Sequence, residues 1–139
     1  KMKKKEYKFP DQKEKMLKNG PWQEEPDKMQ YTDEETGLPC LIVRNHFGNL
    51  CGYVGVSEDH KFYRKNYDSC RGIDVHGGFT FAGEAKEISW PEVKDHMKKN
   101  DLWILGFDTN HAWDTEEKWP KREVLRHTRE IANKLNKIK

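Results

Sequence analysis

The sequence predicts an α+β fold, in which a small and mostly antiparallel sheet has helices packed on it, including a long amphipathic helix at the C-terminus. Three observations predict it. Short apolar runs bounded by turn residues fill the middle of the chain, residues 38–113. Charged residues crowd both ends. Residues 120–138 repeat apolar positions at steps of three and four, the period of a helix that lies on a core.

The N-terminal part is expected to differ from the rest. Residues 1–19 form a Lys-rich segment, in which 11–18 could be a short helix. Residues 20–139 are expected to form a single α+β domain, which is long enough to bury a core without disulfides. A short strand at 29–32 and a turn at 33–37 come first.

The clearest strands are 40–46 and 50–56, and the glycine between them is typical of a tight hairpin. Residues 57–72 are polar and aromatic and are expected to form a long loop or an irregular helical turn. A strand follows at 73–82, and the Gly-Gly pair in its middle predicts a bulge or a close backbone approach.

The last third alternates between helix and strand. Ser89 is a good helix N-cap, so a helix is expected at 89–99. Residues 102–107 are apolar enough for a buried strand, and 108–119 form a loop. Pro120 opens the final helix, whose apolar stripe consists of Val124, Thr128, Ile131, Leu135 and Ile138.

Composition narrows the possible functions. The net charge is only +2, from 26 basic and 24 acidic residues, which argues against a dedicated duplex nucleic-acid binder. No apolar run is long enough to span a membrane, and no signal peptide is visible. The three cysteines are odd in number and form no CxxC motif, which favours a reduced, cytoplasmic compartment. An oligomer is possible.

Two clusters of carboxylate and imidazole side chains predict one polar site. Asp74 and His76 are two apart and share a face if the strand continues through them, and the adjacent Gly77-Gly78 backbone could cradle a phosphate. The alternative is that the two glycines only mark a bulge.

The second cluster follows the expected strand at 102–107. Asp108, His111 and Asp114 are spaced by three and can converge just past the strand end. The structural alternative makes Asp108 an N-cap and His111 a hydrogen-bonded residue with no role in function. Because the two clusters occur together, we expect Asp74, His76, Asp108 and His111 to lie within about 10 Å of one another in one pocket, as catalytic residues.

The chemistry of such a site has two forms. A divalent metal is possible but not required, since no HExxH, HxHxDH or CxxC motif is present. Without a metal, one histidine would be a general acid or base oriented by an aspartate. The remaining candidates are ligand-binding residues that neutralise phosphate or stack on a base, and they are Arg44, His46, Arg64 and Trp113.

Several short motifs resemble a group of small, uncharacterised phage and prophage proteins. The resemblance covers about residues 20–138 and is carried by Gly20-Pro21-Trp22, Glu25-Pro26-Asp27-Lys28, Gly37-Leu38-Pro39-Cys40, Gly52-Tyr53-Val54-Gly55-Val56, Val75-His76-Gly77-Gly78, and Gly106-Phe107-Asp108 with His111. It implies an accessory role in the cytoplasm of a phage's host.

These observations together predict a small hydrolase that acts on a phosphate-bearing nucleotide, for which a cyclic nucleotide of host defence is a candidate. Two alternatives remain open. The same pocket could sequester such a nucleotide without chemistry, or the protein could inhibit another protein. The expected partner is a nucleotide-like small molecule rather than a membrane.

Overall fold

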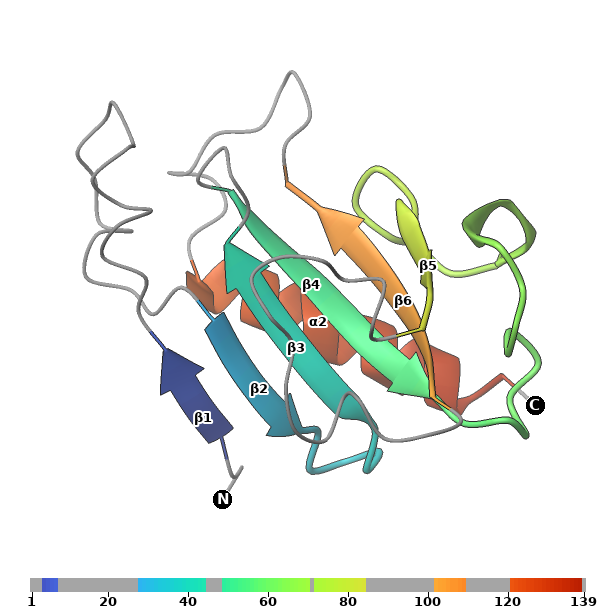
Figure 1. The fold of residues 1–139 in the computed structure, drawn as a ribbon, viewed down its shortest axis with the longest axis horizontal. Coiled ribbons are helices and arrows are strands. Elements are labelled where there is room, and N and C mark those ends of the chain that lie inside the picture. Colours follow the sequence, from blue (N-terminus) through green and yellow to red (C-terminus); the bar gives the residue numbers. More distant parts are fainter. Residues whose placement is uncertain are drawn as a thin grey trace.

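The computed structural model describes residues 4–7, 28–44, 49–70, 72–84, 102–109 and 121–138. The elements follow in the order β1 (Lys4–Tyr7), β2 (Lys28–Thr32), β3 (Pro39–Arg44), β4 (Leu50–Val56), η2 (Tyr67–Ser69), β5 (Phe81–Gly83), β6 (Trp103–Asp108) and α2 (Lys121–Asn136) (Figure 1). The strands form one sheet in the order β1-β2-β3-β4-β6-β5, and all five pairings are antiparallel. The α+β class and the antiparallel sheet are therefore confirmed.

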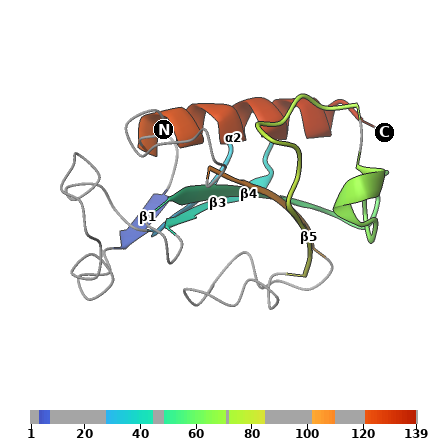
Figure 2. The same cartoon turned by 90° about the horizontal axis from the view of Figure 1, so that it is seen from above.

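Helix α2 covers one face of the sheet (Figure 2). It buries Val124, Thr128, Ile131, Ala132 and Leu135, which pack on the strand residues of that face, among them Ile42, Val54, Leu105 and Phe107. The helix approaches β4 closely at Gly52, where an added Cβ would overlap Thr128 Oγ1 and the Phe107 ring. A side chain at this position would push the helix off the sheet.

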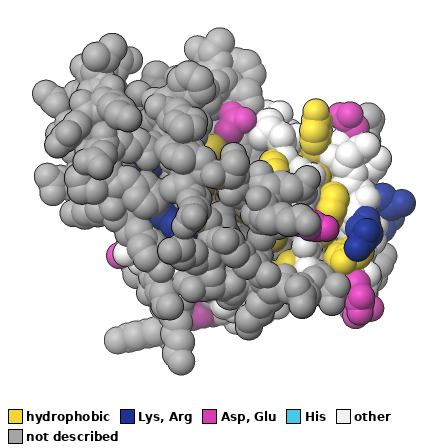
Figure 3. Space-filling view, in the orientation of Figure 1, with side chains coloured by type: hydrophobic (Ala, Val, Ile, Leu, Met, Phe, Trp, Pro, Cys, Tyr) yellow, Lys and Arg dark blue, Asp and Glu magenta, His cyan; other side chains and the backbone are white. Residues whose placement is uncertain are grey.

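The opposite face of the sheet is also largely buried. Its second apolar cluster contains Leu41, Val43, Cys51 and Ile104, with Tyr53, Phe81 and Leu102 packed against it. The rings of Tyr53 and Phe81 meet edge to face at 5.7 Å. This is the face seen in Figure 3, where hydrophobic, acidic and basic side chains show among the described residues.

Two elements differ from expectation. Residues 4–7 form β1, which pairs with β2 at the edge of the sheet, although no strand was expected in the Lys-rich segment. Lysine is a common residue on edge strands, because its charge discourages pairing with other chains. The strand expected at 73–82 is limited to Phe81–Gly83, since Gly77 and Gly78 adopt positive φ angles of 68° and 78° and turn the chain away. The helices expected at 11–18 and 89–99 lie outside the described residues.

The register brings three strand termini together. Arg44 at the end of β3 pairs with Leu50 at the start of β4, and Cys51 of β4 pairs with Asp108 at the end of β6. We call this the Asp108 end of the sheet. The other end of β4 and β6 is marked by the pair Val56 and Trp103.

Candidate functional site

Two of the expected site residues, Arg44 and Asp108, lie at the Asp108 end of the sheet. The backbone here is braced by buried hydrogen bonds: Asn49 Nδ2 donates to the Thr109 carbonyl at 2.9 Å, and Thr109 Oγ1 donates to the Leu50 carbonyl at 2.8 Å. The side chains of Arg44 and Asp108 are therefore attached to a rigid part of the backbone. The expected residues that follow these strands lie outside the described residues, namely His46, His111, Trp113 and Asp114.

Arg44 is among the largest fully buried side chains, with 1% of its surface exposed. It shares the α2 side of the sheet with Ile42, because residues two apart on a strand face the same side. A guanidinium so far removed from water is stable only when it is paired or hydrogen-bonded. Arg44 therefore acts as a buried positive charge at this end of the sheet and not as an exposed surface cation.

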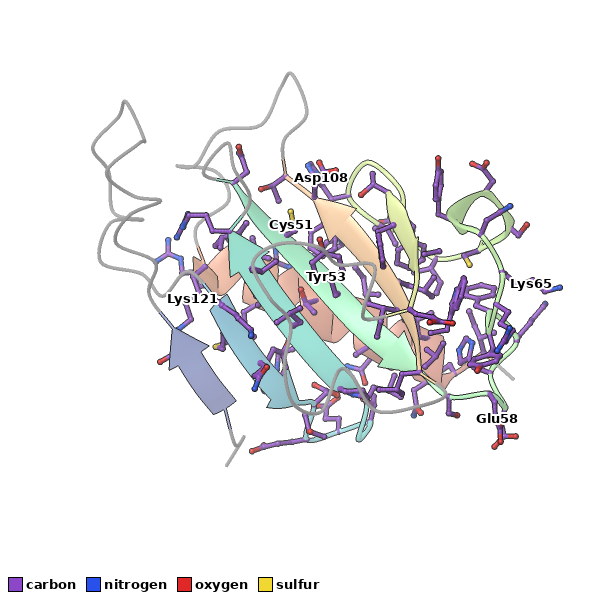
Figure 4. The ribbon with its side chains drawn as sticks, viewed as in Figure 1. Cys51, Tyr53, Glu58, Lys65, Asp108 and Lys121 are labelled. Atoms are coloured by element: carbon purple, nitrogen blue, oxygen red, sulfur yellow. The ribbon has the colours of Figure 1, made fainter. Side chains whose placement is uncertain are left out.

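Asp108 belongs to the other face, where it pairs with Cys51 across the strands. Figure 4 shows Asp108, Cys51 and Tyr53 over the same part of β4 and β6. Burial raises the pKa of Tyr53 above its ordinary value, and its contact with the Cys51 thiol and the nearby Asp108 carboxylate raise it further. The phenol of Tyr53 stays protonated, so it can donate a hydrogen bond but cannot supply a negative charge at neutral pH.

Asp74, His76, Gly77 and Gly78 lie in one tight turn. Val75 anchors it in the core with 8% of its surface exposed, whereas Asp74 and both glycines are exposed. The Gly78 N–H donates to the Val75 carbonyl at 2.8 Å, which closes the turn. The His76 N–H is also used, so two of the N–H groups of the turn are already engaged within the protein. The turn therefore offers fewer backbone N–H donors to a phosphate than the glycine pair suggested.

The turn is fixed to helix α2 by a residue that sequence reasoning missed, His127. Its Nε2 accepts a hydrogen bond from the His76 N–H at 2.9 Å, and its Nδ1 lies 3.1 Å from Glu130 Oε1. Because Nε2 is an acceptor here, Nδ1 carries the proton and donates to Glu130. The ring also meets Phe107 edge to face at 4.9 Å.

Glu130 completes this chain of hydrogen bonds. Its Oε2 accepts from Arg126 Nη1 at 3.0 Å, and the hydrogen bond from His127, followed by the charge of Arg126, lowers the pKa of the Glu130 carboxyl. The one signal in the sequence that could have found the pair is its spacing, since a histidine and a glutamate three residues apart meet on a helix.

The turn and Asp108 share one end of the sheet but not one face. The Thr80 N–H donates to the Gly106 carbonyl, and Phe81 pairs with Gly106, so the preceding turn lies beside the last residues of β6. The His76 main chain, however, contacts α2, whereas Asp108 belongs to the face away from α2. At this end of the sheet, the His76 main chain thus lies on the α2 side and Asp108 on the other side.

Arg64 lies elsewhere. The loop after β4 runs beside the start of β6, because the two strands are antiparallel, and Trp103 Nε1 holds it by donating to the Lys65 carbonyl at 2.8 Å. Arg64 has a φ of 61°, and its guanidinium lies 5.6 Å from the centre of the Tyr63 ring. The structure thus separates Arg64 from Asp108 by the length of β6, because of strand direction.

Within the described ranges, no group of three or more His, Cys, Asp or Glu side chains is placed to hold a metal ion. Cys40, Cys51 and Cys70 are buried free thiols. Burial raises the pKa of Cys40 to about 12, so this thiol is not a nucleophile at neutral pH.

Comparisons of the chain with protein-family models, with curated proteins and with solved structures each find no match. No helix of the described part has the length and apolar character needed to cross a membrane. Function is therefore inferred from the geometry of the chain itself.

Proposed function

We propose that the protein binds a small phosphate-bearing molecule of the nucleotide class at the turn Asp74–Gly78, and that it sequesters this ligand. The observation that carries the proposal is the fixing of an exposed, glycine-containing turn by the hydrogen bond from the His76 N–H to His127. A turn held rigidly by a buried valine and a helix side chain presents its polar groups in one arrangement, which lowers the entropy cost of binding.

The groups around the turn suit a nucleotide. The Gly77 N–H can donate to a phosphate oxygen, and open space lies beside Gly78, where an added Cβ would meet nothing within 4 Å. The exposed Asp74 carboxylate can accept hydrogen bonds from sugar hydroxyls or a base amino group. His76, which is half-buried, belongs to the same turn.

Hydrolysis of the same ligand is a second candidate. The pair His127 and Glu130 supports it, because a carboxylate that orients an imidazole is the arrangement of a general base. Its Nε2, however, already accepts the His76 N–H, so the pair would act only if the ligand displaced that bond. Sequestration needs no such rearrangement and is therefore favoured. In the phage setting that the motifs imply, either activity would withdraw a nucleotide signal of the host.

The experiment incubates the protein with a panel of nucleotides, including cyclic ones, removes unbound material, denatures the protein by heat and identifies what is released by mass spectrometry. Sequestration predicts that one nucleotide returns intact, and hydrolysis predicts its cleavage product. Asp74→Asn should weaken retention by about tenfold, the effect of losing one hydrogen bond to a charged group. Asp59→Asn is the matched control, because Asp59 is an exposed carboxylate in the loop after β4. Retention of nothing from the panel, or equal losses in both variants, would contradict the proposal.

A further inference from the structure

A hollow lies on the flank of α2 away from His127, between the helix and the turn that joins β2 to β3. Its volume is about 360 Å³, which falls within the range of small-molecule sites. Its wall on the helix side carries the guanidinium groups of Arg122, Arg126 and Arg129 around the apolar side chain of Leu125. No feature of the sequence singled out these residues. We call this hollow the arginine groove.

Helical periodicity explains why the arginines converge. Positions 122, 126, 129 and 133 are spaced by four, three and four, so their side chains form one stripe along the helix. The stripe faces Asp33 and Glu35 of the β2–β3 turn. His127 lies on the opposite flank, toward the turn Asp74–Gly78, so the two sites are separate.

Not every acidic side chain of the groove is hydrogen-bonded to an arginine. Asp33 Oδ2 accepts from the Thr36 N–H at 3.0 Å and from Thr36 Oγ1 at 2.7 Å, and the side chain is 3% exposed. Arg129 Nε lies 3.9 Å from Asp33 Oδ1, which is too long for a hydrogen bond. Asp33 is therefore satisfied mainly by its own turn.

Arg126 is the arginine that is already engaged. It donates through Nη2 to Glu123 and through Nη1 to Glu130, each at 3.0 Å. In the part of the chain that the structure describes, Arg122 makes no hydrogen bond or ion pair, and Arg129 makes only its long contact with Asp33. The N–H donors of the Arg122 and Arg129 guanidinium groups are therefore available to a ligand.

We propose that the arginine groove binds the phosphate group of a small phosphate ester, with Arg122 and Arg129 as its ligands. A planar guanidinium matches two phosphate oxygens at once, and two of them neutralise a dianion. Leu125 offers an apolar floor, and Glu35 and Asn133 offer an acceptor and an amide for the hydroxyl groups of the ester. The site is independent of the proposed function and shares Glu130 and Arg126 with the chain of hydrogen bonds behind His127.

The test uses inorganic pyrophosphate as the probe and isothermal titration calorimetry on the full chain, with chloride at equal ionic strength as the reference. Arg122→Gln and Arg129→Gln should each weaken binding by at least about tenfold, because each removes a charged hydrogen-bonding fork. Lys61→Gln, which removes an exposed cation from the distant loop after β4, should change nothing. Unchanged melting temperatures of the variants show that folding is intact, since both arginines lie outside the core.

A third variant separates the two sites. Gly78→Val places a β-branched residue at a φ of 78°, which distorts the turn Asp74–Gly78 and leaves the groove untouched. Loss of pyrophosphate binding in the arginine variants alone supports the groove, whether or not the turn binds nucleotides. Loss in Gly78→Val alone overturns the groove and leaves the proposed function standing. Binding that no variant changes, or no saturable binding to the unmodified protein, also overturns the groove.

Discussion

The backbone N–H of His76 donates a hydrogen bond to Nε2 of His127, 2.9 Å away, across 51 residues of sequence. This contact requires the neutral imidazole, since a protonated ring would place a second N–H against the first. It ties the turn that carries Asp74, Gly77 and Gly78 to the middle of α2. The position of the turn thus depends on one side chain of the helix, with Glu130 behind it.

His127→Ala should release the turn. The His76 amide loses its acceptor, and we expect its hydrogen exchange to accelerate by about fivefold, corresponding to a net hydrogen-bond contribution of about 1 kcal/mol. His127→Gln retains an acceptor oxygen and should restore part of the protection. Exchange measured by NMR checks both variants. His60→Ala is the control, because His60 bonds the Leu135 carbonyl at the other end of α2; equal acceleration at His76 there would show that the effect is general loosening.

Ile131→Asp should destabilise the protein by at least about 3 kcal/mol, because it buries an unpaired charge under α2. Ile131 is 1% exposed and lies in the main core. Urea unfolding followed by circular dichroism measures the loss. Asn136→Asp, an exposed position at the end of the same helix, should cost at most about 1 kcal/mol through the helix dipole. Similar costs for the two variants would mean that Ile131 is not part of the core.

Gly52→Ala tests how closely α2 approaches the sheet. A methyl group there overlaps Thr128 Oγ1 and the Phe107 ring, so we expect a loss of about 1–3 kcal/mol in unfolding free energy. Gly55→Ala on the same strand is the control, since its Cβ would come no closer than 3.0 Å to a neighbour, with side-chain atoms of Pro39, Ile104 and Leu102 at 3.0, 3.2 and 3.7 Å. If Gly52→Ala melts like the unmodified protein, the helix does not lie this close to β4.

Stability should fall as the pH rises above about 9. Burial raises the pKa of Cys40 to about 12 and raises the pKa of Tyr31 and of Tyr53 above the ordinary tyrosine value. These groups therefore keep their protons in the folded chain at a pH where the unfolded chain has lost them. Their contribution is complete below the unfolded pKa values, near 8.5 for cysteine and 10 for tyrosine, and is lost above them. Urea unfolding at pH 8 and near pH 10.5 measures the change.

The variant Tyr53→Phe is the control for the loss of stability at alkaline pH. It removes one ionisable group and should make the fall with pH shallower. A free energy of unfolding that stays constant to the higher pH would show that the three side chains are not buried as described.

The sheet was largely predictable because its central strands carry continuous apolar runs, which only a buried strand tolerates. The strands expected at 40–46, 50–56 and 102–107 lie at 39–44, 50–56 and 103–108, and α2 was expected within a few residues from its apolar period. β1 was not expected as a strand, because Lys-Lys-Glu-Tyr has no alternation of apolar and polar residues. It joins the sheet by pairing with β2. Pairing between distant strands is a property of the whole fold and not of the local residues.

The candidate site was less predictable for the same reason. Asp74, His76 and the glycines were found from their local spacing, and they do lie in one turn. His127 was missed because its role depends on a contact between residues 51 apart. The arginine groove was missed because its stripe becomes visible only when the β2–β3 turn lies opposite it. The expected convergence of His76 with His111 remains a prediction.

Ligand capture by the turn is tested most directly by native mass spectrometry of the protein purified from a nucleotide-rich lysate, followed by release and identification of what it carries. The unmodified protein should retain an intact phosphate-bearing molecule, and Asp74→Asn, an exchange at an exposed position, should retain about tenfold less of it while keeping its melting temperature to within a few degrees. If the unmodified protein carries no small molecule, or if Asp74→Asn retains as much of it, the turn Asp74–Gly78 is not the binding site.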